Sequence, residues 1–201
     1  MKHIYRPSVS PKLFVGNILG AFALGMSGKL DQAVTATIGH NVSSCHALAI
    51  IGTKPDHSIS QLCKTLRLEH SSVVRLVDRL ERENLVRRVR HHGGDRRQVR
   101  IRLTESGEEQ FEKILQARSA VLQDAMHNLT ASEVVMLGEY LSKLMPSVVE
   151  SGDDQDIVCR ICEEGVCPPG SCPARQARVL REQSSQPELI RVLPVADPSY
   201  S

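Results

Sequence analysis

The spacing of apolar residues changes from a helical to an alternating pattern in the middle of the chain, and this change limits the folds that the chain can adopt. From Ser71 to Asn84, apolar residues recur at helical spacing along one face. They are Val73, Leu76, Val77 and Leu80. From Val99 to Leu103, apolar and basic residues alternate, as in a strand with one buried face. The pattern predicts a helix followed by a strand.

A second helix and a second strand are expected around this pair. Ser58-Ile-Ser-Gln61 is a capping box, and the helix that it begins ends near Leu66. Val86–Arg90 is the expected partner of Val99–Leu103 in a β-hairpin, and two glycines in the turn allow positive φ. Two short helices followed by a hairpin predict a winged helix-turn-helix within a mainly α fold, with the hairpin as its small β wing.

Positive charge is concentrated in this unit. Ten arginines lie between Arg75 and Arg102, although the formal net charge of the chain is only +2. Arginine suits bidentate contacts with phosphates and base edges, and a B-DNA major groove, about 12 Å wide, admits one helix. We therefore expect binding to double-stranded DNA rather than a merely solvated charged face. The expected DNA-contacting residues are Ser71, Ser72, Arg75, Arg79, Arg82, Asp95, Arg96 and Arg97.

The roles expected within this set differ. Arg75 could form a bidentate contact with guanine, whereas Arg79 and Arg82 are placed to meet the DNA backbone. At the hairpin tip, Asp95 is expected to hold Arg97 by a charge-assisted hydrogen bond.

Long helices flank the unit. One is expected from Lys12 to about Ile38, with an apolar stripe that a second chain would cover. Another should run from Glu105 to about Asn128, and a third begins at the capping box Thr130-Ala-Ser-Glu133 and ends at Pro146. The acidic segment Ser151-Gly-Asp-Asp-Gln-Asp156 that follows is expected to be a linker. The helix with the sequence CHALAIIGT lies between the first long helix and the capping box at Ser58, and Ser43 or Ser44 could cap it.

The apolar stretch Leu13–Met26 follows a basic start, so a signal peptide is one interpretation and an amphipathic helix the other. The stretch is shorter than the roughly 20 residues that span a bilayer. It continues, without a clear cleavage site, into a polar helical pattern. We therefore expect no membrane partner and a cytoplasmic protein.

Four cysteines lie close together near the C-terminus: Cys159, Cys162, Cys167 and Cys172. Nearby glycines and prolines would let them wrap around one ion. Zinc in a closed tetrathiolate site, an iron–sulfur cluster and reversible redox thiols all remain open, as do four reduced cysteines without a metal. Cys45 and Cys63 lie on apolar helix faces and are expected to fill the core.

Residues 43–107 resemble the MarR family of bacterial transcription regulators. The resemblance rests on SSVVRLVDRLERENLVRR for the recognition helix, on Asp95-Arg-Arg97 in the wing, and on the run from Val99 to Gly107. It implies a homodimer with interleaved terminal helices, two winged domains on a palindromic operator, and regulation by a small-molecule inducer or an oxidant. Some MarR-like proteins carry a similar cysteine-rich extension.

These observations predict four segments. They are a disordered N-terminus (1–11), the winged unit with its dimerisation helices (12–150, DNA-binding core 43–107), a cysteine-rich metal or redox segment (151–177) and a disordered tail (178–201).

The function expected is a transcription regulator, most simply a repressor, that responds to a ligand, a metal or an oxidative stress. The alternatives are a redox or electron-carrier protein, or a zinc-knuckle adaptor, built on the four cysteines. No phosphate-binding loop and no Ser/His/Asp arrangement supports catalysis, so an enzyme is not expected.

Overall fold

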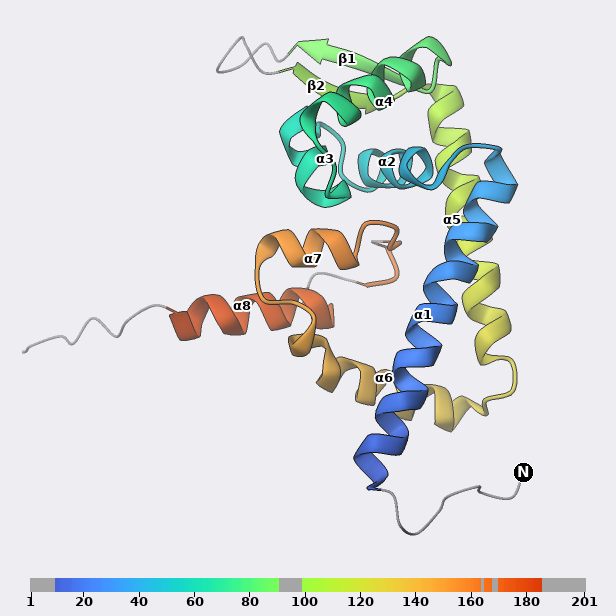
Figure 1. The fold of residues 1–201 in the computed structure, drawn as a ribbon, viewed down its shortest axis with the longest axis vertical. Helices are drawn as coiled ribbons and strands as arrows, with labels where there is room; N and C mark the ends of the chain where they lie inside the picture. The colour runs from blue at the N-terminus through green and yellow to red at the C-terminus, as the bar shows by residue number, and fades with distance from the viewer. Residues whose placement is uncertain (1–9, 91–98, 164, 168–169, 186–201) are drawn as a thin grey trace, which may run out of the picture.

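The computed structural model of this chain describes residues 10–90, 99–163, 165–167 and 170–185. Figure 1 shows its elements, most of them helices, with one short antiparallel hairpin. In chain order they are α1 (Pro11–Ile38), α2 (Val42–Thr53), α3 (Ile59–Leu66), α4 (His70–Arg82), β1 (Val86–Arg90), β2 (Val99–Leu103), α5 (Glu105–Met126), α6 (Ala131–Leu144), the short 3-10 helix η1 (Met145–Ser147), α7 (Gly152–Val158) and α8 (Pro173–Ser185).

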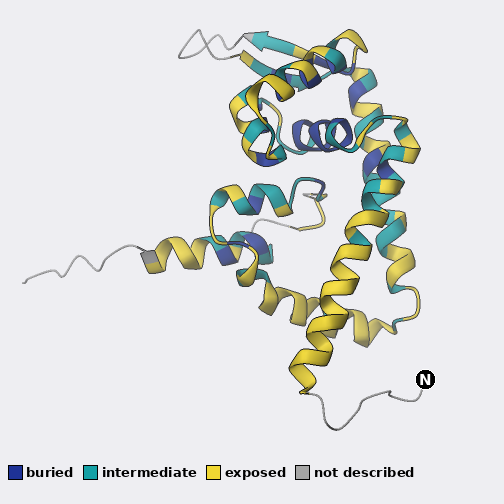
Figure 2. Cartoon of the chain, in the orientation of Figure 1, coloured by how far each residue is buried: buried dark blue, intermediate teal, exposed yellow. Residues whose placement is uncertain are grey.

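The winged helix-turn-helix forms as the sequence predicted. Helix α2 lies at its centre and is almost wholly buried, with α3, α4, the hairpin and the start of α5 around it (Figure 2). The largest fully buried side chains include Leu48, Ile51, Leu62, Leu80 and Ile101, which come from α2, α3, α4 and β2. Burial of this apolar surface is the main driving force that joins the short helices and the hairpin into one unit.

Local sequence signals explain where most of these elements begin. The capping box at Ser58 is present, with the Gln61 amide nitrogen donating to the Ser58 hydroxyl and the Gln61 side chain accepting from the Ser58 amide. The strands pair in the expected register, from Val86 opposite Leu103 to Arg90 opposite Val99. The cap of α2 differs from the prediction. Asn41, rather than Ser43 or Ser44, accepts from the backbone, because α2 begins at Val42 and both serines lie inside its first turn.

The start of α5 is fixed against the hairpin. Thr104 caps the helix by accepting from the amide of Gly107. A Cβ at Gly107 would lie 1.9 Å from the carbonyl oxygen of Leu85, so only glycine allows this close approach. From this anchor α5 runs beside α1 over much of its length (Figure 1).

The first half of α1 and the whole of α6 project away from the winged unit with apolar side chains in solvent (Figure 2). Helix α1 has 28 residues and a mean hydropathy of 1.4 in its most apolar window, none of which is buried. By length and composition it could cross a membrane. The apolar stretch was expected to be too short to do so, but the helix that contains it continues well beyond Met26.

The chain after Leu144 folds back into what we call the C-terminal lobe, formed by η1, α7 and α8. Two expectations for this part were wrong. The acidic segment predicted as a linker contains α7, which Ser151 caps at its N-terminus. Residues 178–185, placed in the disordered tail, belong to α8. Residues 1–9 and 186–201, the rest of the two predicted disordered ends, lie outside the described residues.

Candidate nucleic-acid interface

Helix α4 presents two faces of opposite character, as its sequence predicted. Val73, Val77 and Leu80 are completely buried and Leu76 nearly so, which fixes the helix to the domain. On the outer face Ser71, Ser72, Arg75 and Arg82 are exposed. A helix fixed along one side, with small polar groups and arginines on the other, has the form of a major-groove reading helix.

Arg79 is the exception among the predicted contacts of α4. Its guanidinium donates to the Ser44 hydroxyl on α2, and its Nε is buried without a partner. Arg79 therefore helps to hold α4 against α2 and does not face outward with Arg75. Helical spacing alone could not show this, because the partner lies 35 residues earlier in the chain.

A structural role for Arg88 was missed. Its guanidinium donates to Asp78 at 2.5 Å and also to Glu81, both on α4, and its backbone amide donates to Glu81 at 3.1 Å. These contacts bind strand β1 to the recognition helix. The available signal was the pair of acidic residues one helical turn apart, opposite a basic strand.

The second strand is held in a comparable way. Arg102 donates twice to the Asp56 carboxylate, at 2.5 and 2.9 Å, and this interaction raises the pKa of Arg102. Arg100 donates to the backbone oxygen of Asp56 at 3.1 Å. The arginine-rich stretch thus serves two purposes. Some of its arginines fasten the wing to the domain, and others, including Arg75, Arg82 and Arg87, remain exposed.

The predicted wing-tip contacts Asp95, Arg96 and Arg97, together with the turn that carries them, lie outside the described residues. The strands that lead to this turn extend from the same side of the domain as α4 (Figure 1).

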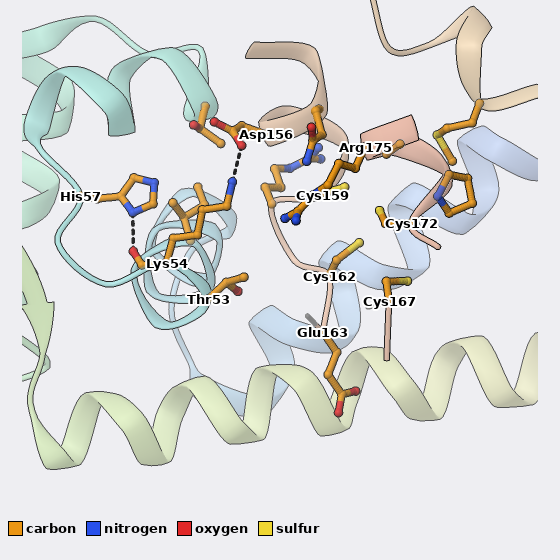
Figure 3. A pocket seen from close by; sticks show the side chains of 17 residues that line it. Thr53, Lys54, His57, Asp156, Cys159, Cys162, Glu163, Cys167, Cys172 and Arg175 are labelled. Carbon is orange, nitrogen blue, oxygen red and sulfur yellow. Dashed lines mark hydrogen bonds and ion pairs between the residues drawn. The ribbon is translucent and has the colours of Figure 1, made fainter. Parts of the chain in front are cut away.

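The four predicted cysteines come together in the C-terminal lobe. Cys159 caps the C-terminus of α7, and Cys172 immediately precedes α8. Together with Cys162 and Cys167, they line one cavity of about 140 Å³ (Figure 3). Among the described residues, no group of three or more His, Cys, Asp or Glu side chains is arranged to hold one metal ion. The four cysteines therefore line the same cavity, but they do not converge on a position that one metal ion could occupy.

Two of these thiols influence each other directly. A hydrogen bond with Cys159 lowers the pKa of Cys162 to about 6, and the positive charges of Arg118 and Arg160 act in the same direction. The same interaction raises the pKa of Cys159. By contrast, burial raises the pKa of Cys45 to about 11, as expected for a cysteine that fills the core.

Three ion pairs join the C-terminal lobe to the helix-turn-helix. Lys54, after α2, pairs with Asp156 of α7 at 2.5 Å, as Figure 3 shows. At the end of α3, Lys64 pairs with Asp153 at 3.6 Å and Arg67 with Asp154 at 3.7 Å. The acidic residues taken for a linker therefore form a docking surface for the DNA-binding unit.

A further contact reaches the first helix. Arg160 donates to His46 on α2 at 3.3 Å, and the other ring nitrogen of His46 lies 3.0 Å from Asp31 of α1. Burial lowers the pKa of His46, and the nearby Arg160 lowers it further. The cysteine segment is thus linked through one buried histidine to the helix expected at a dimer interface.

Comparisons with known proteins agree with this geometry. Residues 41–99 match the sequence model of the MarR family, and the match ends before the four cysteines. Over 86 residues the chain is 31% identical to the HTH-type transcriptional repressor MdtR of Bacillus subtilis (strain 168). This match covers 43% of the chain and 55% of the relative, so the chain spans about half the length of that curated protein.

Solved structures share the fold. A MarR family protein from Bacillus stearothermophilus is 25% identical, with a TM-score of 0.59 over 70% of this chain and 98% of its own. Streptococcus pneumoniae FabT in complex with DNA is 21% identical, with a TM-score of 0.54 over 67% of this chain and 94% of its own. At these identities the likeness concerns the fold, and it confirms the predicted winged helix with long flanking helices.

Proposed function

Because this chain carries a MarR-family winged helix-turn-helix, we propose that it is a transcription regulator that binds double-stranded DNA as a homodimer. The observation that carries the proposal is helix α4, whose apolar face is buried while Ser71, Ser72 and Arg75 stand exposed at its start. The N-terminal residues of a recognition helix are the ones that reach base edges in the major groove. No catalytic activity is proposed.

The contacts divide by role. Arg75 is placed to recognise a guanine through two hydrogen bonds, which would give sequence preference. Arg82 and Arg87, farther from the start of α4, would neutralise phosphates and give affinity without sequence preference. The pairs of Arg88 with α4 keep the wing and the helix in one rigid unit, so both can follow the surface of the duplex together.

A homodimer accounts for the apolar surface on α1 and α6. Phe22 and Leu24 on α1 are 56% and 80% exposed, and Val135 and Tyr140 on α6 are 63% and 59% exposed. Contiguous apolar surface of this kind marks an interaction site. A second copy covers it most economically, because a two-fold axis would pair the same helices and bring two recognition helices to successive half-sites of a palindrome.

Repression is the proposed direction of regulation. A dimer on a promoter excludes polymerase without further machinery, and the matched Bacillus subtilis relative is described as a repressor. An effector that changes the separation of the two recognition helices would release the operator. The protein is proposed to act in the cytoplasm, with a small molecule, a metal or an oxidant as the effector.

Selection of bound sequences from a pool of random duplexes tests the proposal. The purified full-length chain should enrich an inverted repeat with half-sites about one helical turn apart, and hydroxyl-radical footprints should show protection on one side of the duplex. Recovery of no enriched sequence, or of a single unrepeated half-site, would contradict a sequence-specific dimer.

A further inference from the structure

We propose that the four cysteines of the C-terminal lobe hold an iron–sulfur cluster, and that this cluster keeps α7 docked on the helix-turn-helix. The ligands would be Cys159, Cys162, Cys167 and Cys172. They come from the end of α7, from the loop after it and from the start of α8, and their side chains line one cavity (Figure 3). The second half of the proposal, on regulation, rests on the proposed DNA-binding function.

The size of the cavity favours a cluster over a single ion. Zinc binds thiolates at about 2.3 Å, which brings the four sulfur atoms to within about 4 Å of each other and leaves no space between them. Here the four cysteines form part of the wall of a cavity of about 140 Å³, which residues of α2, α3 and α7 also line. That is roughly ten times the volume that one water molecule requires. A cavity of this size beside four thiols has room for a cluster of several iron and sulfide ions.

The arrangement of the described side chains points the same way. No three His, Cys, Asp or Glu residues among them are arranged for a single metal ion, although all four cysteines line the same cavity. Cys159 and Cys162 are close enough to share a hydrogen bond, and Cys167 and Cys172 line the same cavity, so a bound cluster would bridge this pair and the other two thiols.

The charges around the cavity suit an anionic group. Four thiolates give a cluster a net negative charge, which must be balanced when it lies at a partly enclosed site. Lys54, Arg160 and Arg175 line the cavity, with Asp156 and Glu163 as the acidic members. Asp156 already pairs with Lys54, and Arg118 of α5 adds a hydrogen bond to Cys162. Positive charge therefore predominates around the proposed ligands.

The same segment contacts the DNA-binding unit. Helix α7 ends at Cys159, and its carboxylates Asp153 and Asp154 pair with Lys64 and Arg67. Arg67 is the C-cap of α3, with a left-handed backbone (φ 53°), and lies in the turn between the two helices of the motif. Ion pairs this exposed are weak individually. A ligand at Cys159, which caps the C-terminus of α7, would therefore add to the hold on this helix.

Loss of the cluster would thus release α7 from α3 and loosen the turn that leads to α4. The cluster-bound form should bind the operator more tightly than the apo form. Coupling between two sites in one protein is commonly about 5- to 150-fold in affinity, and we expect a difference within this range. Agents that remove or destroy the cluster would then act as inducers.

The first test measures the ligand without reference to DNA. The full-length chain is reconstituted anaerobically with ferrous iron and sulfide and then desalted. We expect visible absorption from iron–thiolate charge transfer and equal amounts of iron and acid-labile sulfide, roughly four of each per chain for a [4Fe–4S] cluster or two for [2Fe–2S]. Cys167→Ser, which changes the exposed ligand, should reduce both contents. Cys45→Ala, which changes a core cysteine, should reduce neither.

Three results would overturn this part of the proposal. They are a colourless protein that binds one zinc ion and no sulfide, disulfides in place of bound iron, and equal iron content in the wild-type chain and the Cys167→Ser variant. Circular dichroism on each variant shows whether the lobe still folds, so loss of iron through unfolding is recognised separately. Cys172→Ser provides a second ligand variant from a different element.

The second test measures the coupling. Operator affinity is compared between cluster-bound and apo protein, first in the wild-type chain and then in the variant Asp153→Asn/Asp154→Asn. The variant should bind the cluster normally but lose most of the difference in affinity. Glu109→Gln/Glu112→Gln removes two exposed charges from α5 and should keep the difference. Equal affinity of cluster-bound and apo wild-type protein, or tighter binding by the apo form, would overturn the coupling.

The two proposals can fail separately. A chain that assembles the cluster but binds no duplex in either state would refute the proposed DNA-binding function and leave the cluster site intact. A chain that binds an operator but assembles no cluster would refute only the inference drawn from the four cysteines.

Discussion

Truncation of Phe22 on α1 tests the proposed dimer with a magnitude that can be worked from the structure. The side chain is 56% exposed in the single chain. Full burial of a phenylalanine contributes about 1.5–3 kcal/mol, so covering the exposed part contributes about 0.8–1.7 kcal/mol per protomer. Two copies meet in the dimer, which gives about 1.7–3.4 kcal/mol in total.

Phe22→Ala should therefore weaken dimerisation by about 15- to 270-fold, at 1.4 kcal/mol for each tenfold change. Sedimentation equilibrium over a range of protein concentrations measures the dissociation constant. Leu180→Ala is the matched control, because Leu180 is 60% exposed but belongs to α8, which is not part of the proposed interface.

An unchanged dissociation constant for Phe22→Ala would refute the argument from exposed apolar surface. An equal loss from Leu180→Ala would show that the interface includes α8 and that α1 was wrongly chosen. A wild-type chain that remains monomeric at all accessible concentrations would refute the dimer itself.

Other variants test the remaining steps. Gly107→Ala places a Cβ 1.9 Å from the Leu85 carbonyl oxygen and should lower the free energy of unfolding in urea by at least about 2 kcal/mol. Gly28→Ala, whose added Cβ would meet nothing within 4 Å, should raise it by up to about 1 kcal/mol. Equal effects of the two variants would contradict the packing described. Because burial lowers the pKa of His46 below its ordinary 6.5, the unfolded chain takes up a proton first as the pH falls. The free energy of unfolding should therefore decrease below about pH 6.5, and His46→Gln should flatten that decrease. Arg75→Ala should weaken binding to the preferred operator by about 1–3 kcal/mol and reduce the sequence preference at one base pair. If Arg75 contacts only phosphate, the preference at that base pair should not change.

The sequence was sufficient to predict the DNA-binding unit, because the patterns that specify its helices and strands involve residues close together in the chain. The buried face of α4 follows from the spacing of Val73, Leu76, Val77 and Leu80. The capping boxes at Ser58 and Thr130 depend on side chains three residues apart, so the sequence displays them directly. The alternation of apolar and basic residues in Val99–Leu103 indicates a strand with one buried face, and its predicted pairing with Val86–Arg90 is observed.

The C-terminal lobe was missed because its order depends on distant partners. Residues 151–158 contain little apolar periodicity, and their acidic run is typical of a linker. Helix α7 is instead stabilised by a serine cap, by two aspartates in its first turn, and by cations at the C-terminal ends of α2 and α3. The pair between Lys54 and Asp156 joins residues 102 positions apart, which a local pattern cannot reveal.

The roles of individual arginines were also beyond the sequence pattern. Arg75 and Arg79 are one helical turn apart, yet Arg75 is exposed and Arg79 turns inward to Ser44. The difference arises from the position of α2, since a hydroxyl lies within reach of one side chain only. Composition predicted a basic surface, and the tertiary contacts determine which members of it remain available to DNA.

The dependence of operator binding on salt tests the central claim most directly. Gel-shift titrations of the wild-type chain on its selected operator should show the logarithm of affinity falling linearly with the logarithm of salt concentration. For about six to ten neutralised phosphates, affinity should fall roughly 10³- to 10⁵-fold between about 50 and 200 mM salt. Affinity that changes less than about tenfold over this range would mean that few phosphates are neutralised. The exposed arginines of α4 and β1 would then not form a DNA-binding surface.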